Sequence, residues 1–275
     1  MTPLLTAPLF AELRRACHDG SLTWRCSLDL GQTVTDVILR PDHWEARGGT
    51  FPYLEHAKDR TIYHWGGSDF MPVARFSGSL VKLVPTPWGP PTFEIDGIKM
   101  LRSESVSPFL DAQEKVALIE PRGKALLDCC GGLGYFASSA LVQNASRIVS
   151  FEKNADVLWL RSLNPWSPAA DARLQVTHGD VVRHIETLRS GEFDAVLHDP
   201  PRVSIAGELY SGRFYEQLAR VMKPHGRLFH YTGAPQRASH GRDLAKEVIR
   251  RLNKCGFRAE KALDGVFAVR RQRPS

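Results

Sequence analysis

Four short apolar segments in the second part of the chain each end at an acidic residue. They cover residues 125–127, 148–151, 174–177 and 195–197, and the acids that follow them are Asp128, Glu152, Asp180 and Asp199. Short apolar runs that alternate with helix-compatible stretches are typical of buried parallel strands. The carboxyl ends of such strands converge on one crevice. The pattern predicts an α/β fold with a doubly wound, mostly parallel sheet and a ligand crevice at its acidic edge.

A glycine-rich turn follows the first of these segments. Residues 128–134 read Asp-Cys-Cys-Gly-Gly-Leu-Gly, and residues 135–141 can start a helix. Glycines let a ligand approach the backbone, and the amides of a helix start point at it. Such a turn serves dinucleotides, S-adenosylmethionine and plain tight packing alike. Glu152 lies where a doubly wound sheet places an acid to hold a ribose, and Asp180 can accept a hydrogen bond from an adenine amino group.

The fourth segment opens into His198, Asp199, Pro200, Pro201 and Arg202. Two prolines fix φ and give a rigid wall at the end of a buried strand. The Asp199 carboxylate and the Pro200 carbonyl can each accept a hydrogen bond from one amino group. His198 is able to relay the amine proton, although a hydrogen-bonded wall histidine is more typical at such a position. Asp199, Pro200, Pro201 and His198 are therefore the catalytic candidates.

The ordered acids and the spacing of Gly132 and Gly134 resemble the class I S-adenosylmethionine-dependent methyltransferases over about residues 108–270. The resemblance implies a seven-stranded Rossmann-like sheet and S-adenosyl-L-methionine as cofactor. The residues it assigns to the cofactor are Asp128, Cys130, Gly132, Gly134, Glu152, Lys153 and Asp180. In that family an acid-Pro-Pro motif followed by an aromatic residue marks enzymes that methylate exocyclic or other planar nitrogens of nucleic acids and proteins.

The fourth position of this motif is Arg202, where the family has an aromatic residue. Arg202, or the nearby ring of Tyr210 or Tyr231, is expected to stack on the substrate instead. His230 closes the next strand beside the same crevice and completes the expected substrate contacts, Arg202, Tyr210, His230 and Tyr231.

Longer stretches are similar to a family of predicted methyltransferases best represented in archaea. They include residues 97–100, 164–167, 199–202, 206–210 and 227–231, and the similarity extends from about residue 22 to the end. This resemblance implies a base amine of RNA as methyl acceptor, with cytosine N4 of rRNA as the leading candidate.

The net charge of +6 and the sequence pI of about 9.2 fit a polyanionic partner such as RNA. Basic residues gather at Arg237, His240, Arg242, Lys246, Arg250, Arg251 and Lys254, and again at Arg258, Lys261, Arg270, Arg271 and Arg273. An RNA-contacting surface and a solvated helix face with a charged tail are both compatible with this pattern. No apolar run reaches the roughly 18 residues of a membrane helix, and a cytoplasmic location is expected. The five cysteines show no metal-ligand spacing, so no metal is expected.

The organisation of the chain changes near residue 105. Residues 1–105 are expected to form a β-rich domain with a helix at 4–17 and a possible part in substrate recognition, and residues 106–275 the methyltransferase domain. The expected N-terminal strands are 23–30, 34–39, 60–65, 70–76, 80–84 and 92–95. Residues 257–261 and 265–270 are close enough in sequence to form a hairpin at the end of the sheet.

Two other functions use the same fold. A polyamine aminopropyltransferase needs several carboxylates to hold a polycation, but the only nearby acid after Asp199 in the sequence is Glu208, with Arg202 and Arg213 around it. Lys115, in the helix before the glycine turn, is expected to be an ordinary exposed lysine rather than a ligand of the cofactor carboxylate. A nonenzymatic RNA-binding protein of this fold is the third possibility, against which the intact Asp199-Pro200-Pro201 wall argues.

Overall fold

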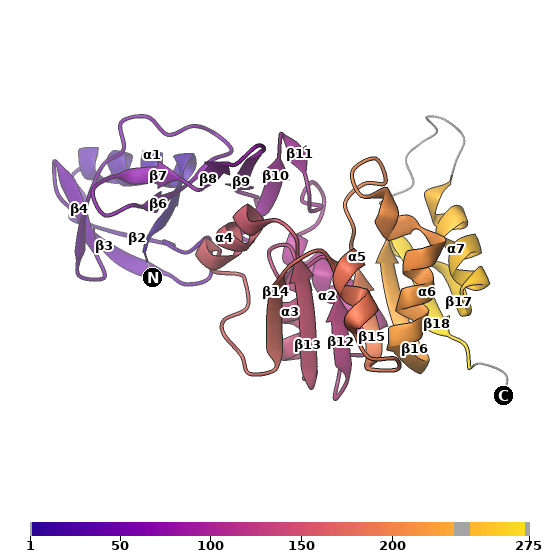
Figure 1. Ribbon diagram of the computed structural model, residues 1–275. Helices are drawn as coiled ribbons and strands as arrows, with labels where there is room; N and C mark the ends of the chain where they lie inside the picture. Colours follow the sequence, from indigo (N-terminus) through magenta and orange to yellow (C-terminus); the bar gives the residue numbers. More distant parts are fainter. Residues whose placement is uncertain (1, 234–242, 273–275) are drawn as a thin grey trace. The chain divides into compact units, whose positions relative to one another are not determined.

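The computed structural model describes residues 2–233 and 243–272 (Figure 1). The chain forms two compact units: an N-terminal unit of residues 1–108 and 159–166, and a C-terminal unit of residues 109–158 and 167–275. Each unit contains its own cluster of buried apolar side chains. The basic residues Arg237, His240, Arg242 and Arg273 lie outside the described residues.

A seven-stranded sheet is the centre of the C-terminal unit, and it confirms the predicted doubly wound fold (Figure 1). The spatial order is β14-β13-β12-β15-β16-β18-β17, and every neighbouring pair up to β16 is parallel, whereas β18 is antiparallel to both of its neighbours. The strands are β12 (Ala125–Asp128), β13 (Arg147–Glu152), β14 (Leu174–His178), β15 (Phe193–His198), β16 (Met222–Tyr231), β17 (Phe257–Ala262) and β18 (Gly265–Arg270). This order brings the carboxyl ends of β12, β13, β14 and β15 to one edge.

Helices cover the sheet on both faces. The helices after residue 107 are α2 (Pro108–Leu118), α3 (Tyr135–Val142), α4 (Ala155–Leu163), α5 (Val181–His184), α6 (Gly212–Val221) and α7 (Leu244–Lys254), with short 3₁₀ turns η1 (Ile185–Thr187) and η2 (Gly207–Tyr210). In Figure 1, α5 and α6 lie in front of the sheet and α2 and α3 behind it. Three of these helices, α5, α6 and α7, begin at a residue whose side chain accepts a hydrogen bond from a backbone amide of the first turn; these residues are Asp180, Ser211 and Asp243.

Residues 2–107, which are the described first part of the N-terminal unit, form one helix and three small antiparallel sheets. Their orders are β1-β6-β7, β2-β3-β4-β5 and β11-β10-β9-β8. The elements are β1 (Leu4–Thr6), α1 (Ala7–His18), β2 (Thr23–Cys26), β3 (Thr35–Leu39), β4 (His43–Ala46), β5 (Gly49–Pro52), β6 (Ile62–Trp65), β7 (Phe70–Pro72), β8 (Ala74–Phe76), β9 (Leu80–Val84), β10 (Thr92–Ile95) and β11 (Ile98–Lys99). Trp44 is wholly buried at the centre of its core, where its ring stacks on Phe51 with centroids 4.5 Å apart.

The N-terminal unit differs from the sequence prediction at its first helix. The helix begins at Ala7, because Thr6 is extended and residues Leu4 to Thr6 pair with β6 instead. A proline in the first turn marks the start that the apolar periodicity alone placed too early. The predicted strand 70–76 is divided between β7 and β8, and β4, β5 and β11 were not predicted because polar residues interrupt their apolar alternation.

Candidate active site

The glycine turn is held between the two strands that flank β12. The Gly131 amide donates to the Phe151 carbonyl at the end of β13 (2.8 Å), and the Cys129 amide donates to the Leu197 carbonyl near the end of β15 (3.0 Å). Gly132 and Gly134 both have left-handed backbones, with φ of +49° and +83°. Side chains are disfavoured in that region, so the turn presents bare backbone at the start of α3.

The acids at the ends of β12 and β13 lie beside this turn, and Glu152 holds it. Asp128 is fully buried, and its Oδ2 accepts a hydrogen bond from Ser150 Oγ (2.8 Å). Glu152 Oε2 accepts from the Gly132 amide (2.9 Å), and Oε1 accepts from the Asn154 amide (2.8 Å). The carboxylate of Glu152 therefore lies directly against the glycine turn, where the sequence placed the ribose contact.

Asp180 and Lys153 form the next part of the same edge. Asp180 Oδ1 accepts from the Val182 amide (3.0 Å), and Lys153 Nζ lies 2.8 Å from Asp180 Oδ2. Burial alone would raise the pKa of Asp180, but the hydrogen bonds from Lys153 and Val182 outweigh burial and lower it. Asp180 is thus an ionised acceptor. The bare glycine backbone and the adjacent acceptor carboxylates of Glu152 and Asp180 match the groups that an adenosine cofactor requires.

The Asp199 wall stands next to the glycine turn. Asp199 is partly exposed and Pro200 is buried. Tyr210, itself buried, donates its hydroxyl to the Pro201 carbonyl (3.0 Å) and so fixes the two prolines. Burial raises the pKa of Asp199 to about 7, and Lys115 opposes this increase. Asp199 is therefore poised between its charged and neutral forms near neutral pH.

Lys115 is a site residue that the sequence did not reveal. It is 2 % exposed, and its Nζ lies 2.5 Å from Asp111 Oδ2 and 3.2 Å from Asp264 Oδ2. The ammonium also lies 4.4 Å from the centre of the Tyr231 ring. Burial alone would lower the pKa of Lys115, but attraction to Asp199, Asp111 and Asp264 raises it. We call Lys115, Asp111, Asp264 and Asp199 the Lys115 cluster.

The structure corrects two expectations here. Lys115 is buried rather than exposed. Glu208 is not the only acid near Asp199, because Asp111 from α2 and Asp264 from the β17–β18 turn also act on it electrostatically. Neither acid is near Asp199 in sequence, so only the fold brings them together. A buried lysine on a helix also gives no signal of its own, since lysines are rarely buried.

His198 and His230 are buried in the wall and do not face a substrate, contrary to the expectation from sequence. Both are 0 % exposed. His198 Nε2 donates to the Leu209 carbonyl (3.0 Å), and burial lowers the pKa of His198 to about 4. His230 Nε2 accepts from the Tyr215 hydroxyl (2.9 Å), and its Nδ1 donates to the Tyr231 carbonyl (2.8 Å). Both rings are neutral packing groups behind the Asp199 wall, and we assign neither a proton relay.

The remaining expected site residues lie at different depths. Arg202 is exposed, whereas Tyr231 is partly exposed beneath Lys115. Burial raises the pKa of the Cys130 thiol well above its ordinary value. The thiol is therefore protonated at neutral pH and is no nucleophile. Within residues 2–233 and 243–272, no group of three or more His, Cys, Asp or Glu side chains is arranged to hold a metal ion.

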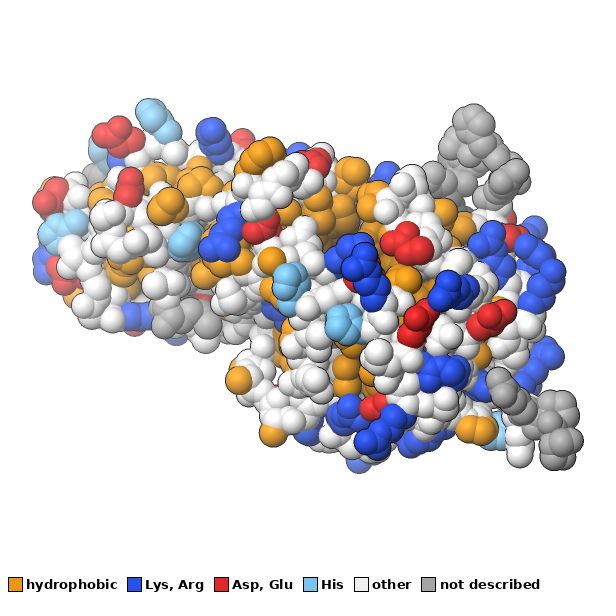
Figure 2. Space-filling model, viewed as in Figure 1, with side chains coloured by type: hydrophobic (Ala, Val, Ile, Leu, Met, Phe, Trp, Pro, Cys, Tyr) orange, Lys and Arg blue, Asp and Glu red, His pale blue; other side chains and the backbone are white. Residues whose placement is uncertain are grey.

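Basic side chains gather on the C-terminal unit beside α7 (Figure 2). Several already have intramolecular partners. Arg251 Nη1 donates to the Tyr210 carbonyl (2.7 Å), Arg250 pairs with Glu247 (2.6 Å), and Lys261 pairs with Asp243 (2.6 Å). Part of this basic surface therefore stabilises the fold. None of the described helices combines the length and hydrophobicity needed to cross a lipid bilayer.

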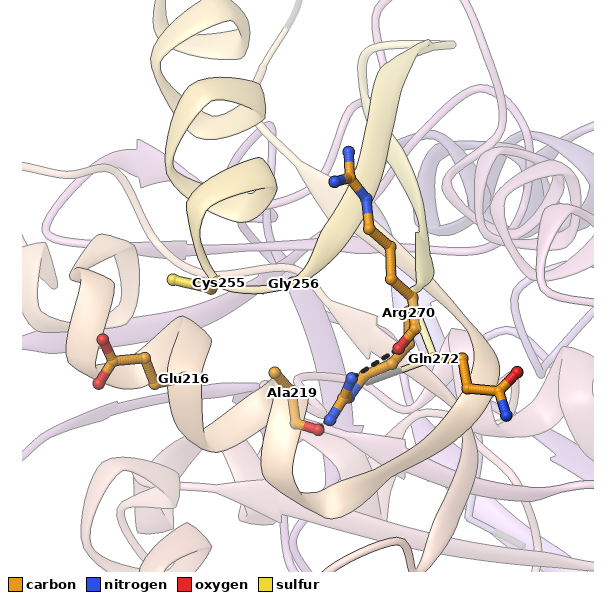
Figure 3. A pocket seen from close by; sticks show the side chains of 7 residues that line it. Glu216, Ala219, Cys255, Gly256, Arg270 and Gln272 are labelled. Carbon is orange, nitrogen blue, oxygen red and sulfur yellow. Dashed lines mark hydrogen bonds between the residues drawn. The ribbon is translucent and has the colours of Figure 1, made fainter. Parts of the chain in front are cut away.

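A separate hollow of about 210 Å³ lies at the opposite edge of the sheet (Figure 3). Glu216, Ala219, Cys255 and Arg270 contribute to its lining. Arg270 pairs with Phe257 at the start of β17, far along the ladder from the Tyr231 end of β16. The buried Arg270 guanidinium donates to the Ala219 and Arg271 carbonyls. This hollow is thus remote from the acids and belongs to the packing of β18.

Comparison with known proteins identifies relatives of this chain. Residues 159–271 match a family described as S-adenosyl-L-methionine-dependent methyltransferase. The uncharacterized protein MJ1233 of Methanocaldococcus jannaschii is 42 % identical over 221 residues, which cover 78 % of this chain and 75 % of that protein. Polyamine aminopropyltransferase 2 of Streptomyces coelicolor is 38 % identical over 65 residues, which cover 23 % of this chain and 12 % of that protein.

Solved structures share the fold at low identity. A spermidine synthase in complex with the transition-state analogue AdoDATO has a TM-score of 0.59 at 17 % identity, over 71 % of each chain. MnmC2 of Aquifex aeolicus has a TM-score of 0.51 at 19 % identity, over 73 % of this chain and 72 % of that one. The sheet and its acidic edge define a class I, Rossmann-like methyltransferase. Within that class the chain belongs to the family of the M. jannaschii protein, and its cofactor is S-adenosylmethionine.

Proposed function

We propose that this enzyme methylates an exocyclic amine of a nucleobase in RNA, and that cytosine N4 of rRNA is the acceptor. The observation that carries the proposal is Asp199, a partly exposed carboxyl with two prolines behind it and the cofactor turn beside it. A carboxylate and a carbonyl on a rigid wall suit a planar amine with two N–H donors. The charge of +6 supports a polyanionic carrier of that amine.

The chain's own residues would position the amine more than activate it. Bound S-adenosylmethionine supplies a methyl group on a positively charged sulfur. Asp199 accepts a hydrogen bond from one N–H of the amine, which keeps the lone pair of the amine nitrogen turned toward the glycine turn. The Tyr210 hydroxyl donates to the Pro201 carbonyl and so holds the Asp199-Pro200-Pro201 wall rigid. As the nitrogen gains positive charge, the Asp199 carboxylate stabilises it and can take the proton.

Replacement of Asp199 tests the proposal. In the Asp199→Asn variant we expect methyl transfer to RNA to fall by at least about 100-fold, because a neutral amide cannot stabilise the charge that develops on nitrogen. The measurement is methyl incorporation from labelled S-adenosylmethionine into total RNA from cells lacking this protein, with identification of the digested nucleosides. N4-methylated cytidines with the wild type, absent with the variant, are the expected result.

Two controls make that result specific. Glu208→Gln changes an exposed carboxylate in the segment after the wall and should leave transfer intact. Cofactor binding to Asp199→Asn should remain, because the hydrogen bond from the Gly132 amide to Glu152 Oε2, which holds the glycine turn, does not involve Asp199. If the wild type binds the cofactor but transfers no labelled methyl group to the RNA, the proposal that RNA is the substrate is refuted.

Polyamine aminopropyl transfer is the second candidate, and the Lys115 cluster favours considering it. Three carboxylates near one another would hold a cationic amine, but the ammonium of Lys115 already lies between Asp111 and Asp264. An internal cation in that place disfavours a second one by charge and by volume. The cluster therefore supports a neutral acceptor over a polyamine.

Removal of that ammonium should reverse the preference. We expect Lys115→Met to acquire saturable spermidine binding that the wild type lacks, measured by isothermal titration calorimetry. Lys115→Arg, which keeps the charge, should behave as the wild type, and Lys115→Met combined with Asp264→Asn should lose the acquired binding. Tight spermidine binding by the wild type would instead favour the aminopropyltransferase.

A further inference from the structure

A cavity of about 460 Å³ opens in the N-terminal unit. Its lining includes Arg47, Gly49 and Thr50 from the β4–β5 hairpin, together with Phe51 and Trp65. The volume lies within the range of about 300–1,000 Å³ typical of small-molecule sites. Among the described residues that line it, none is acidic and Arg47 is the one cation. The cavity thus combines aromatic rings with one guanidinium.

Arg47 occupies a position where the turn itself disfavours it. Arg47 and Gly48 connect the paired residues Ala46 and Gly49, and both have positive φ, +51° and +77°. Two-residue hairpin turns of this kind prefer Asn-Gly, because the Cβ of most residues is strained in the left-handed region, a strain that asparagine tolerates and that glycine avoids. The local backbone therefore gives no reason for an arginine.

A buried carboxylate fixes the Arg47 side chain. Asp29 is 4 % exposed and lies 3.4 Å from Arg47 Nη2, which also donates to Thr33 Oγ1 and Thr35 Oγ1, each at 3.1 Å. Asp29 in turn accepts from Ser27 Oγ and the Thr33 amide, each at 2.8 Å. The guanidinium is thus held in one orientation before any ligand arrives, which lowers the entropic cost of binding.

The aromatic part of the cavity is also rigid. Phe51 is buried against Trp44, and the half-buried Trp65 meets the Phe51 ring edge to face with centroids 5.3 Å apart. The Gly49 backbone packs against the Phe51 ring so closely that a Cβ there would lie 2.7 Å from it. Fixed rings beside a fixed guanidinium suit a ligand that is planar at one end and anionic at the other.

We propose that this cavity binds one nucleotide of single-stranded RNA, with the base against Trp65 and Phe51 and the phosphate on Arg47. Unpaired bases stack on aromatic rings and their phosphates pair with arginine. An acidic peptide would use the guanidinium but leave the aromatic wall without a planar partner. The inference rests on the RNA part of the proposed function and assigns the N-terminal unit a substrate-binding role.

Arg47→Asn is the decisive variant, because Asn-Gly is the preferred turn sequence and the fold should be retained. The measurement is the affinity of the full-length protein for a fluorescein-labelled oligocytidylate across a salt titration, without cofactor. We expect affinity to fall about tenfold and the slope of log affinity against log salt to shrink by about 0.7, the value for one phosphate contact on a single strand. A melting temperature equal to that of the wild type would show that folding is unchanged.

The matched control is Arg40→Asn, an arginine that pairs with Glu45 on the neighbouring strand and does not line the cavity. It should leave affinity and salt slope unchanged. Equal effects of the two variants, or an unchanged affinity of Arg47→Asn, would overturn the proposal. The proposal would also be overturned if inorganic phosphate displaced the oligocytidylate at the same concentration as cytidine monophosphate. Equal competition would show that the cavity binds the anion without any contribution from the rings.

A second variant tests the aromatic contact. Trp65→Leu should weaken the binding of cytidine monophosphate by about tenfold and leave the weaker binding of inorganic phosphate unchanged. If the wild type binds RNA through Arg47 but does not methylate it, the proposed function is refuted and this inference stands. If the wild type methylates RNA but the Arg47 and Trp65 variants bind RNA as tightly as the wild type, this inference alone is refuted.

Discussion

The environment of Asp199 determines its chemistry more than the residue type does. Burial raises its pKa to about 7, the positive charge of Lys115 lowers it, and Asp111, Asp264 and Asp128 raise it. An exposed aspartate would be fully ionised far below neutral pH. Burial, with a smaller contribution from the neighbouring acids, therefore keeps the Asp199 carboxyl close to its titration point at neutral pH.

This environment predicts the pH dependence of the reaction. The charged form of Asp199 stabilises the developing positive nitrogen, so kcat/KM for RNA should fall as the pH drops through about 7. Measurement from about pH 5.5 to about pH 9 checks this, and Asp199→Asn, with its low residual rate, should lack the limb. A limb near the ordinary pKa of an aspartate would mean that burial does not act on this carboxyl.

At the scale of elements, the β17–β18 hairpin delivers Asp264 to the Lys115 cluster. The turn between the strands consists of Leu263, with a left-handed φ of +50°, and Asp264, which is buried. Gly265 then starts β18 against β16. A Cβ at Gly265 would lie 2.3 Å from the His230 carbonyl oxygen and 2.9 Å from the Phe229 ring. Only glycine lets the hairpin approach closely enough to bring Asp264 to Lys115.

Gly265→Ala should therefore destabilise the protein. We expect a loss of about 2 kcal/mol in the free energy of unfolding, because the obstructing atom is backbone in the neighbouring strand and cannot move without disturbing the ladder. Chemical denaturation measures the change. Gly212→Ala, at the open start of α6 where nothing lies within 4 Å of the added Cβ, is the control and should cost little. Similar losses at both positions would contradict the steric argument.

At the scale of the whole molecule, the order of the strands brings four acids that are far apart in the sequence to one edge of the sheet. Residues 128, 152, 180 and 199 meet because β14, β13, β12 and β15 are parallel neighbours. This was predictable, since each strand carried a short apolar run with an acid within three residues of its end. The N-terminal unit was less predictable, because short antiparallel strands such as β4 and β5 rest on pairing between segments rather than on their own apolar pattern.

The sequence by itself determined the doubly wound sheet, the glycine turn and the position of Asp199 at a strand end, because these depend on local apolar periodicity and on residues adjacent in the chain. Only the tertiary structure decided that Lys115, Asp111 and Asp264 surround Asp199, and that His198 and His230 are buried behind it. Burial and charge pairing are properties of contacts between distant segments, and they appear only once the sheet has brought those segments together.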